Sequence, residues 1–416
     1  MDAAIKDFKF KEVFNGAVII AALGYFVDVY DLILFGMVRI KSLTDLGVKG
    51  PDIDTVGIYL HNCQFIGMMI GGIFWGILGD KKGRLSVLFA SIITYSIANI
   101  ANGMISTVDA YAFWRFIAGF GLAGELGVGI TLVSEGMSKE HRGYGTMLVA
   151  SIGVTGAIAA AILSKLLDWR MVYFIGGGLG IVLLLLRIKV SESGIFKHMD
   201  ESGTSKGNFF QLFSGRKILS KYLKCIFIGT PIWFVIGFLI MYASKNVKLT
   251  NISPEIPIDT PMIIMVYYIG LTIGDIMSGM LSQYLKSRRV AVLVFIMSTL
   301  FFTLVYFFVP IPSLMLFYIL CGLLGLSCGY WAVFITISAE QFGTNIRSTV
   351  ANTAPNFVRG MFFLMGVLLN FFIGLFPPHM TLAPILTVGA ITFGLALLSL
   401  YYLEESFGRD LDYLEK

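Results

Sequence analysis

Long apolar runs alternate with short polar segments along nearly the whole chain. Twelve of these runs reach the length of about 20 residues that an α-helix needs to cross a lipid bilayer. The predicted spans are 14–40, 55–79, 85–105, 109–137, 144–166, 170–190, 220–244, 260–284, 290–310, 312–339, 348–376 and 381–403. The pattern therefore predicts an all-α membrane protein with twelve transmembrane helices.

The composition supports this prediction and narrows the classes of function. Of the 416 residues, 56% are hydrophobic and only 14% are charged, and the mean hydropathy is +0.81, whereas about 25% of the residues of a soluble domain are charged. The basic residues collect in the segments on one side of the predicted spans, which by the positive-inside rule puts both termini in the cytoplasm. We therefore expect a multi-pass protein of the cell (inner or plasma) membrane. The net charge of +5 indicates topology rather than nucleic-acid binding.

The longest polar stretch between two spans divides the chain into two similar halves. It covers 191–219 and is predicted to be a cytoplasmic loop. The loop would join an N-terminal six-helix bundle, 1–190, to a C-terminal six-helix bundle with a short cytoplasmic tail, 220–416. The halves resemble each other weakly, since a glutamate is followed seven residues later by an arginine after both the fourth and the tenth span. Two related bundles are typical of an alternating-access transporter.

The segment Gly76-Ile77-Leu78-Gly79-Asp80-Lys81-Lys82-Gly83-Arg84 resembles the signature that the major facilitator superfamily carries after its second span. The segments 115–121, 340–347 and 404–411 resemble motifs of its sugar-porter branch and of the related proton symporters of metabolites, aromatic acids and phosphate. The resemblance implies the major facilitator fold, two pseudo-symmetric six-helix bundles that open alternately to either side. Residues 191–194 differ from the sugar-porter pattern at this place, which argues against a hexose substrate.

A gate is predicted at the cytoplasmic ends of the spans. Glycines there permit a tight turn, and acidic and basic side chains can pair with one another. Salt bridges of this kind would lock the two halves while the cavity faces outward and would break when it faces inward. The predicted gate and motif residues are Gly79, Asp80, Gly83, Arg84, Glu135, Arg142, Glu340 and Arg347.

Asp28 and Asp31 lie within the first predicted span, where a charge costs at least about 2.5 kcal/mol. Because they share one helix face, at least one of them tends to hold a proton, as a proton-coupled carrier requires. Arg115 of the fourth span lies at a comparable depth, and the resemblance implies that a span-1 acid faces a span-4 arginine. We predict that Asp31, assisted by Asp28, alternates between pairing with Arg115 and carrying a proton. The alternatives are a static ion pair and a substrate-binding role for Asp28.

Further ionisable residues lie inside other spans. Glu125, near the middle of the fourth span, is predicted to be a second proton-coupling site or a partner of Arg359. Arg359 follows Asn356 in the eleventh span, and a cation flanked by amides at this depth is predicted to hold an anionic substrate. The alternative for Arg359 is a structural pair with Glu125 or Asp275. Asp275 itself is expected to pair near the basic turn 286–289.

Several polar and aromatic side chains are candidates for the lining of a cavity, with simple packing as the alternative for each. The predicted substrate-binding residues are Arg359, Asn356, Gln64, Tyr267, Trp331 and Trp233. His61, near the outer end of the second span, is predicted to be a surface or gate residue.

Together, the sequence predicts a secondary active transporter that imports a small hydrophilic metabolite, an organic acid or a zwitterion, with protons. The alternatives are a proton-antiport exporter of a drug or metabolite, a phosphate or polyol symporter, and a non-transporting receptor with a transporter fold. Because no nucleophile–base constellation or metal-ligand spacing appears, we expect no enzyme, no catalytic residue, no metal and no cofactor, with the proton gradient as the energy source. The expected partners are the substrate, protons and the lipid bilayer, without nucleic acid, and the protein is expected to be a monomer.

Overall fold

The computed structural model describes residues 16–138, 141–187, 209–243, 259–411, 413 and 415. Within these residues, twelve helical segments are long and apolar enough to cross a membrane, and their ends lie within about five residues of the predicted ones. Residues 14 and 15 of the first predicted span and residues 191–208 of the predicted central loop lie outside the described residues.

The helices follow one another as the hydrophobic pattern predicts, although several spans consist of two elements. The N-terminal half contains α3 (Gly16–Asp45), α4 (Asp52–Lys82), α5 (Arg84–Asn102), α6 (Val108–Leu122), α7 (Leu126–Gly136), α8 (Arg142–Val154), α9 (Gly156–Leu166) and α10 (Trp169–Leu186). The C-terminal half contains η2 (Phe209–Phe213), α12 (Arg216–Phe234), the π-helical turn η3 (Val235–Ile240), α14 (Thr260–Tyr284), α15 (Arg288–Phe308), α16 (Leu314–Cys328), α17 (Trp331–Glu340), α18 (Arg347–Leu375) and α19 (Ala383–Tyr402).

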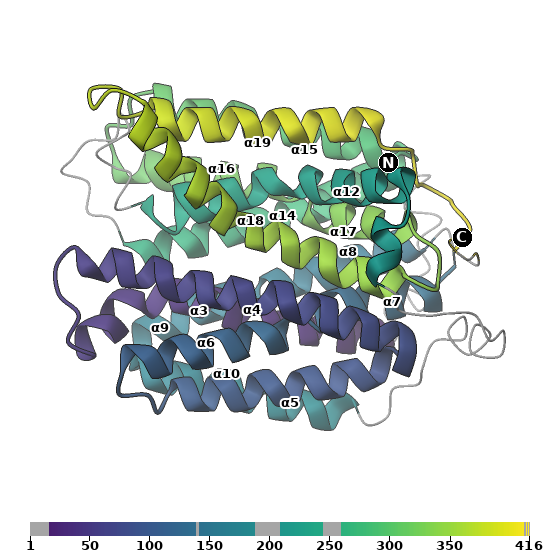
Figure 1. Ribbon diagram of the computed structural model, residues 1–416, viewed down its shortest axis with the longest axis horizontal. Helices are drawn as coiled ribbons and strands as arrows, with labels where there is room; N and C mark the ends of the chain where they lie inside the picture. Colours follow the sequence, from purple (N-terminus) through teal and green to yellow (C-terminus); the bar gives the residue numbers. More distant parts are fainter. Residues whose placement is uncertain are drawn as a thin grey trace.

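The two halves lie side by side as two bundles, drawn in purple to blue and in teal to yellow (Figure 1). In the N-terminal half, α4 packs on α6, α5 on α10, and α3 on α8 and α9. In the C-terminal half, α14 packs on α16, and α12 on α19. The halves meet mainly where α18 lies along α4 and where α14 lies along α8.

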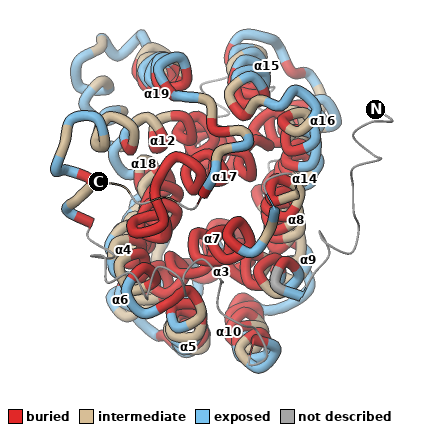
Figure 2. Tube along the Cα trace, turned by 90° about the vertical axis from the view of Figure 1, so that its right-hand side faces the viewer, coloured by how far each residue is buried: buried red, intermediate tan, exposed pale blue. Residues whose placement is uncertain are grey.

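The most buried spans are the first, fourth, seventh and tenth. In the most apolar stretch of each of these spans, 78% to 83% of the residues are buried, against 39% to 50% for spans 3, 6, 9 and 12. An end-on view agrees, because buried segments face the middle of the molecule and exposed ones form its rim (Figure 2). Every third span, beginning with the first, is therefore a central one. The four central spans, α3, α6–α7, α12–η3 and α16–α17, lie around the middle of the molecule.

Three of these central spans are not continuous α-helices. Span 4 is interrupted at residues 123–125, span 7 passes into η3 after Phe234, three residues beyond Pro231, and span 10 is interrupted at Gly329 and Tyr330. At Gly329, a Cβ atom would overlap the backbone of Gly274, so α14 and the broken span meet backbone to backbone. Broken spans bring helix ends into the interior, where they face polar groups.

Candidate functional site

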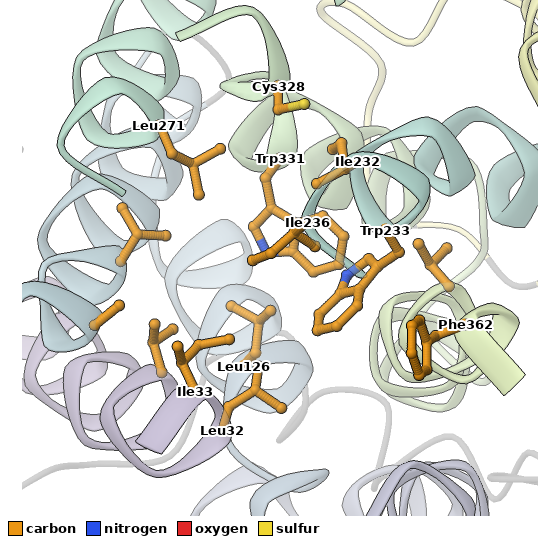
Figure 3. Close-up of a cluster of buried hydrophobic side chains, with 14 of the residues drawn as sticks. Leu32, Ile33, Leu126, Ile232, Trp233, Ile236, Leu271, Cys328, Trp331 and Phe362 are labelled. Atoms are coloured by element: carbon orange, nitrogen blue, oxygen red, sulfur yellow. The ribbon is translucent and has the colours of Figure 1, made fainter. Parts of the chain in front are cut away.

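A closed cavity lies between the two halves. Tyr25 and Leu32 of α3 line it on one side, and Trp233, Trp331 and Arg359 line it on the other. Its volume is about 20 Å³, which is room for about one water molecule. Apolar side chains of both halves gather here, among them Leu32, Trp233 and Trp331 (Figure 3). The site is therefore a small chamber with a mixed aromatic and aliphatic wall that contains one guanidinium group.

The structure brings together most of the residues that were predicted to bind substrate. Trp233, Tyr267, Trp331 and Arg359 line the cavity. Asn356 lies behind Arg359 and accepts a hydrogen bond from its Nη1 at 3.2 Å. Gln64 does not line the cavity but contacts Arg115.

Arg359 pairs with Asp28 across the two halves. Its Nη2 lies 3.3 Å from Oδ2 of Asp28, and its guanidinium group lies 5.7 Å from the ring centroid of Trp331. Oδ1 of Asp28 has no hydrogen-bond partner among the described residues. Neither Glu125 nor Asp275, the alternative partners named for Arg359, pairs with it in this structure, because α18 turns Arg359 toward α3 instead.

Asp31 and Arg115 do not form the predicted ion pair in this structure. Oδ2 of Asp31 accepts a hydrogen bond from the Asn99 amide of α5, and its Oδ1 faces Gly176 of α10. Arg115 instead donates to Oε1 of Gln64 on α4. Asp31 and Arg115 lie on neighbouring helices, but the carboxylate of Asp31 bonds to an amide of α5 and the guanidinium group of Arg115 to an amide of α4.

Glu125 pairs with Arg187, a residue that the sequence pattern does not mark as a partner. Both carboxylate oxygens accept from the guanidinium group, at 3.1 and 2.8 Å, and Oγ of Ser91 donates to Oε1 at 2.9 Å. A Cβ atom at Gly24 would overlap Arg187 and lie 2.8 Å from Glu125 Oε2. Of the two alternatives for Glu125, the pair with Arg359 does not form in this structure, and Gly24 leaves room for the pair with Arg187 that does form.

The sequence gives only a weak indication that Arg187 is a buried partner of an acidic side chain. Arg187 follows a run of leucines at the end of α10, where a basic residue usually marks only the end of a span. In the structure it is 1% exposed, because it caps α10 and turns inward to Glu125. A basic residue at a span end is thus not always a topology marker.

Asp275 also has a different partner from the expected one. Its Oδ1 accepts a hydrogen bond from the backbone amide of Ala332 at 3.0 Å, at the beginning of α17. The basic turn bonds elsewhere: Arg288 pairs with Glu340 at 3.2 Å, and Arg289 donates to the carbonyl of Tyr401.

The predicted gate residues gather at the end of the bundle where the described tail residues 403–411, 413 and 415 lie, and we call this the tail end. Glu340 accepts from Arg142 at 3.0 Å, and Glu135 accepts from Arg84 and Arg347 at 3.0 Å each. The pairs of Arg142 with Glu340 and of Arg347 with Glu135 join the two halves. All five of these side chains are nearly or fully buried, so water does not screen the pairs as it screens a surface salt bridge.

The remaining motif residues add backbone contacts at the same end. Asp80 accepts from the backbone amides of Ser348 and Thr349, at 3.1 and 2.8 Å, at the beginning of α18. Gly83 has a φ of 97°, which favours glycine. A Cβ atom at Gly79 would lie 2.5 Å from Oγ of Ser348, so this close approach also requires glycine.

The tail was not predicted to take part in the gate. The carbonyl of Arg409 accepts from Arg142 at 2.7 Å, and Ser406 Oγ donates to Glu340 at 2.8 Å. Thr344 donates its backbone amide to the carbonyl of Tyr413 at 2.8 Å. The tail therefore covers the charged contacts between the halves.

At the opposite end of the bundle, the halves are also in contact. Nδ1 of His61 lies 3.0 Å from the hydroxyl of Tyr242, and the Arg39 guanidinium lies 4.4 Å from the centroid of the same ring. Phe65 packs edge-on against Trp233 with centroids 5.2 Å apart. His61 is 1% exposed, so it is part of this contact rather than a surface residue. Because both ends are shut, the structure is an occluded conformation.

The sequence matches the family model of the Major Facilitator Superfamily over residues 21–354. The chain belongs to this superfamily. The fold agrees, since the solved structure of the major facilitator proton:xylose symporter XylE, bound to 6-bromo-6-deoxy-D-glucose, aligns with a TM-score of 0.72. The alignment covers 97% of this chain and 98% of that chain at 14% identity, and a likeness at this identity shows the fold alone.

Two bacterial relatives of this major facilitator protein match over most of their length. A Bacillus subtilis protein named for niacin and nicotinamide transport is 24% identical over 82% of this chain and 84% of its own. The sialic acid transporter NanX of Escherichia coli is 26% identical over 79% of each chain. The protein is therefore a multi-pass membrane transporter of small metabolites and not an enzyme. Within the part of the chain that the structure describes, no group of three or more His, Cys, Asp or Glu side chains could hold a metal ion.

Proposed function

We propose that this transporter imports a small metabolite with a carboxylate group, together with protons, by alternating access. The observation that carries the proposal is the ion pair between Asp28 and Arg359 at the wall of the occluded cavity. A substrate carboxylate would bind Arg359 in place of Asp28. The displaced Asp28 would then take up a proton, because a buried carboxylate without a partner is costly. Binding of the anion and binding of the proton would thus favour each other.

The wall of the cavity supports a substrate with an apolar or aromatic part. Trp233, Trp331 and Tyr267 present rings to it, and few hydroxyl or amide groups face it. A polyol would leave many of its hydroxyl groups without partners in such a chamber, which costs binding energy. Niacin and sialic acid, which the names of the relatives mention, both carry a carboxylate group, in keeping with Arg359 as the anion site; of the two, only niacin also has the aromatic, hydroxyl-poor body that this wall favours.

We propose Asp31 as a second proton site beside Asp28. Its Oδ1 has no hydrogen-bond partner among the described residues, and its Oδ2 holds Asn99. In this proposal Asp31 pairs with Arg115, as the sequence predicts, in another conformation of the transport cycle. Glu125 has a different role in this proposal, as the structural partner of Arg187.

The contacts at the two ends would act as the two gates. The tail end would be the cytoplasmic side of the inner membrane, where Glu340 and Glu135 hold the halves together. The opposite end, with His61 and Tyr242, would face outward. A cavity of about 20 Å³ cannot hold a metabolite, so at least one gate would open before substrate enters.

The first experiment identifies a ligand and tests the anion site. Purified protein is screened by thermal shift against small carboxylic acids, beginning with nicotinate and N-acetylneuraminate. Arg359→Gln should lose the ligand-induced shift, and its affinity should fall by about 10- to 100-fold, the value of a hydrogen bond to a charged group. Asp28→Asn should keep the shift, because it frees Arg359. A ligand that stabilises both variants as it does the wild type would contradict this assignment.

The second experiment tests the direction of coupling. In proteoliposomes with a uniform orientation, an acidic outer buffer should drive accumulation of the identified ligand. Accumulation that requires an acidic lumen instead would establish the antiport alternative and exclude proton-coupled import.

A further inference from the structure

Asp275 is a buried carboxyl group that the proposed coupling of Asp28 and Arg359 does not use. It lies on α14 and is 0% exposed. Its Oδ1 accepts the backbone amide of Ala332 at 3.0 Å, while its Oδ2 has no hydrogen-bond partner among the described residues. No described cation forms a salt bridge with it. A carboxyl group with one bonded and one free oxygen in an apolar interior is unusual, because both its ionised and its neutral form lack a full set of partners.

The bonded oxygen, Oδ1 of Asp275, caps the beginning of α17, the second helical part of span 10. Span 10 is interrupted at Gly329 and Tyr330, and α17 begins at Trp331. The N-cap residue Tyr330 supplies no side-chain cap, so the amides at the beginning of α17 need an acceptor from elsewhere. Gly329 and Gly274 let α14 approach closely enough for Asp275 to supply it: a Cβ atom at Gly329 would lie only 2.5 Å from the backbone nitrogen of Asp275, and one at Gly274 would overlap the carbonyl oxygen of Leu326.

The capped helix begins with a residue of the cavity wall. Trp331 lines the cavity, and its Nε1 donates to the hydroxyl of Tyr25 on α3 at 2.7 Å. The ring centroid of Trp331 also lies 5.7 Å from the guanidinium carbon of Arg359. The position of the first turn of α17 therefore determines how Trp331 bridges the two halves beside the ion pair of Arg359.

We propose that Asp275 is a further proton-binding residue, on the C-terminal half, and that it acts as a positioning residue for Trp331. When ionised, the carboxylate is a strong acceptor at the positive end of α17 and holds the beginning of this helix in place. When a proton from the aqueous phase binds to Oδ2, the group becomes neutral and the cap weakens. Trp331 then moves more freely relative to Tyr25 and Arg359, and the cavity can change shape.

The switch depends on the proton of Asp275 itself, because no charged side chain faces this carboxyl group among the described residues. The titratable groups that face it are the phenols of Tyr25 on α3 and Tyr268 on α14 and the thiol of Cys328 on α16. From α17 only backbone amides face it, and the described parts of α8, α9 and α15 bring no ionisable side chain to it. Within the described residues, the groups that face Asp275 carry no charge around neutral pH, and the charged pair of Asp28 and Arg359 acts on Tyr25 and Tyr268 rather than on Asp275 itself.

Infrared difference spectroscopy tests the protonation directly and needs no substrate. Spectra of the purified protein in lipid are compared between about pH 5 and about pH 8. Histidines and buried carboxyl groups change their protonation in this range. The wild type should show the C=O band of a protonated carboxyl group that Asp275→Asn lacks and Asp275→Glu restores at a shifted position. If Asp275→Asn retains every carboxyl band of the wild type, Asp275 binds no proton and the proposal is overturned.

Tryptophan fluorescence tests the link to Trp331. The wild type should show a pH-dependent change that disappears in Trp331→Phe and in Asp275→Asn. Ser278→Ala serves as the matched control, because Ser278 lies one turn further on α14 and donates only to the backbone carbonyl of Asp275; it should keep the change. The same pH-dependent change in Asp275→Asn as in the wild type would overturn the positioning role.

The inference rests on the proposed function only in placing Trp331 at the transport cavity, and the two fail separately. Loss of the infrared and fluorescence signals in Asp275→Asn would stand even if the transporter proved to be an exporter. Conversely, proton-coupled uptake with unchanged spectra in Asp275→Asn would support the role of Asp28 and overturn that of Asp275.

Discussion

Asp28 and Arg359 join the two halves of the transporter in its interior. Oδ2 of Asp28 lies 3.3 Å from Nη2 of Arg359, and both side chains are at most 1% exposed. Removing or neutralising only one member of such a pair is costly, because the remaining charge is left buried without a partner. A proton on Asp28 or an anion on Arg359 changes this balance, which makes the pair a natural place for coupling.

Asp28→Asn should abolish proton-driven accumulation and leave substrate exchange largely intact. Asparagine keeps the size of aspartate but cannot carry a proton, so the expected loss of accumulation is at least about tenfold, which corresponds to 1.4 kcal/mol. The measurement compares uptake driven by a pH gradient with counterflow in the same proteoliposomes.

Asp31→Asn is the matched comparison for this experiment. It lies three residues further on the same helix face, and its oxygen is held by an amide rather than by a cation. If Asp28→Asn accumulates substrate with the wild-type pH dependence and Asp31→Asn does not, Asp31 is the main proton carrier and the role of Asp28 proposed above is wrong.

Gly24→Ala should destabilise the protein by about 1–3 kcal/mol, the usual cost of overpacking. The added methyl group would overlap Arg187 and crowd Glu125, so the buried ion pair would have to shift. Thermal unfolding of the purified protein measures the change.

Gly178→Ala is the control for this substitution. Gly178 lies in α10, and a Cβ atom there would meet nothing within 4 Å. Because alanine favours a helix more than glycine does, this variant should be neutral or more stable by up to about 1 kcal/mol. Equal destabilisation by both substitutions would show that the space around Arg187 does not explain the effect of Gly24→Ala.

Glu340→Gln should favour opening at the tail end. Glu340 is the shared acceptor of Arg142, Arg288 and Ser406, and a neutral amide binds two guanidinium groups far less strongly than a carboxylate does. A bias of a few kcal/mol is enough to shift the populations of two conformations.

Maleimide labelling can follow this opening. Thr336 is buried on α17, and its hydroxyl lies 2.9 Å from that of Thr146 across the two halves, so Thr336→Cys reports on their separation. In a background without the native cysteines, Glu340→Gln should raise the labelling rate several-fold. Glu404→Gln should leave the rate unchanged, because Glu404 pairs with Arg409 at the exposed surface. No increase in Glu340→Gln would argue against a gate at this place.

Glu405 should make the stability of the tail dependent on pH. Burial by itself raises the pKa of Glu405, but the hydroxyl of Ser287 and the backbone amides of Phe407, Arg288 and Arg289 donate to the carboxylate and together hold the pKa below its usual value. A carboxyl group with a lowered pKa in the folded state stabilises that state at neutral pH. This stabilisation is lost as the pH falls below the usual glutamate value of about 4.3.

The thermal stability of wild type and Glu405→Gln should therefore converge in acid. At neutral pH the variant should unfold at a lower temperature, because it lacks the carboxylate that binds the beginning of α15. Below about pH 4 the difference should shrink. A difference that stays constant over this range would mean that Glu405 does not titrate as its contacts indicate.

Much of the fold follows from the hydrophobic pattern and the motifs. A bilayer accepts only segments that are long, apolar and internally hydrogen-bonded, so the twelve spans can be located from length and composition alone. The motif residues after spans 2, 4 and 10 also lie together at one end, because the two halves repeat the same order of helices. The interruptions at Gly329 and at residues 123–125 could not be located in this way, since a broken span is as apolar as a continuous one.

The sequence by itself determined which residues lie inside the membrane and at what depth. It predicted that Asp28, Asp31, Arg115, Glu125 and Arg359 are buried charges that need partners. Only the tertiary structure decided the pairs: Asp28 with Arg359, which is 331 positions away, Asp31 with Asn99, and Glu125 with Arg187. The physical reason is that helical periodicity reports the face and depth of a residue on its own helix, whereas the packing and rotation of neighbouring helices decide which side chains meet at that depth.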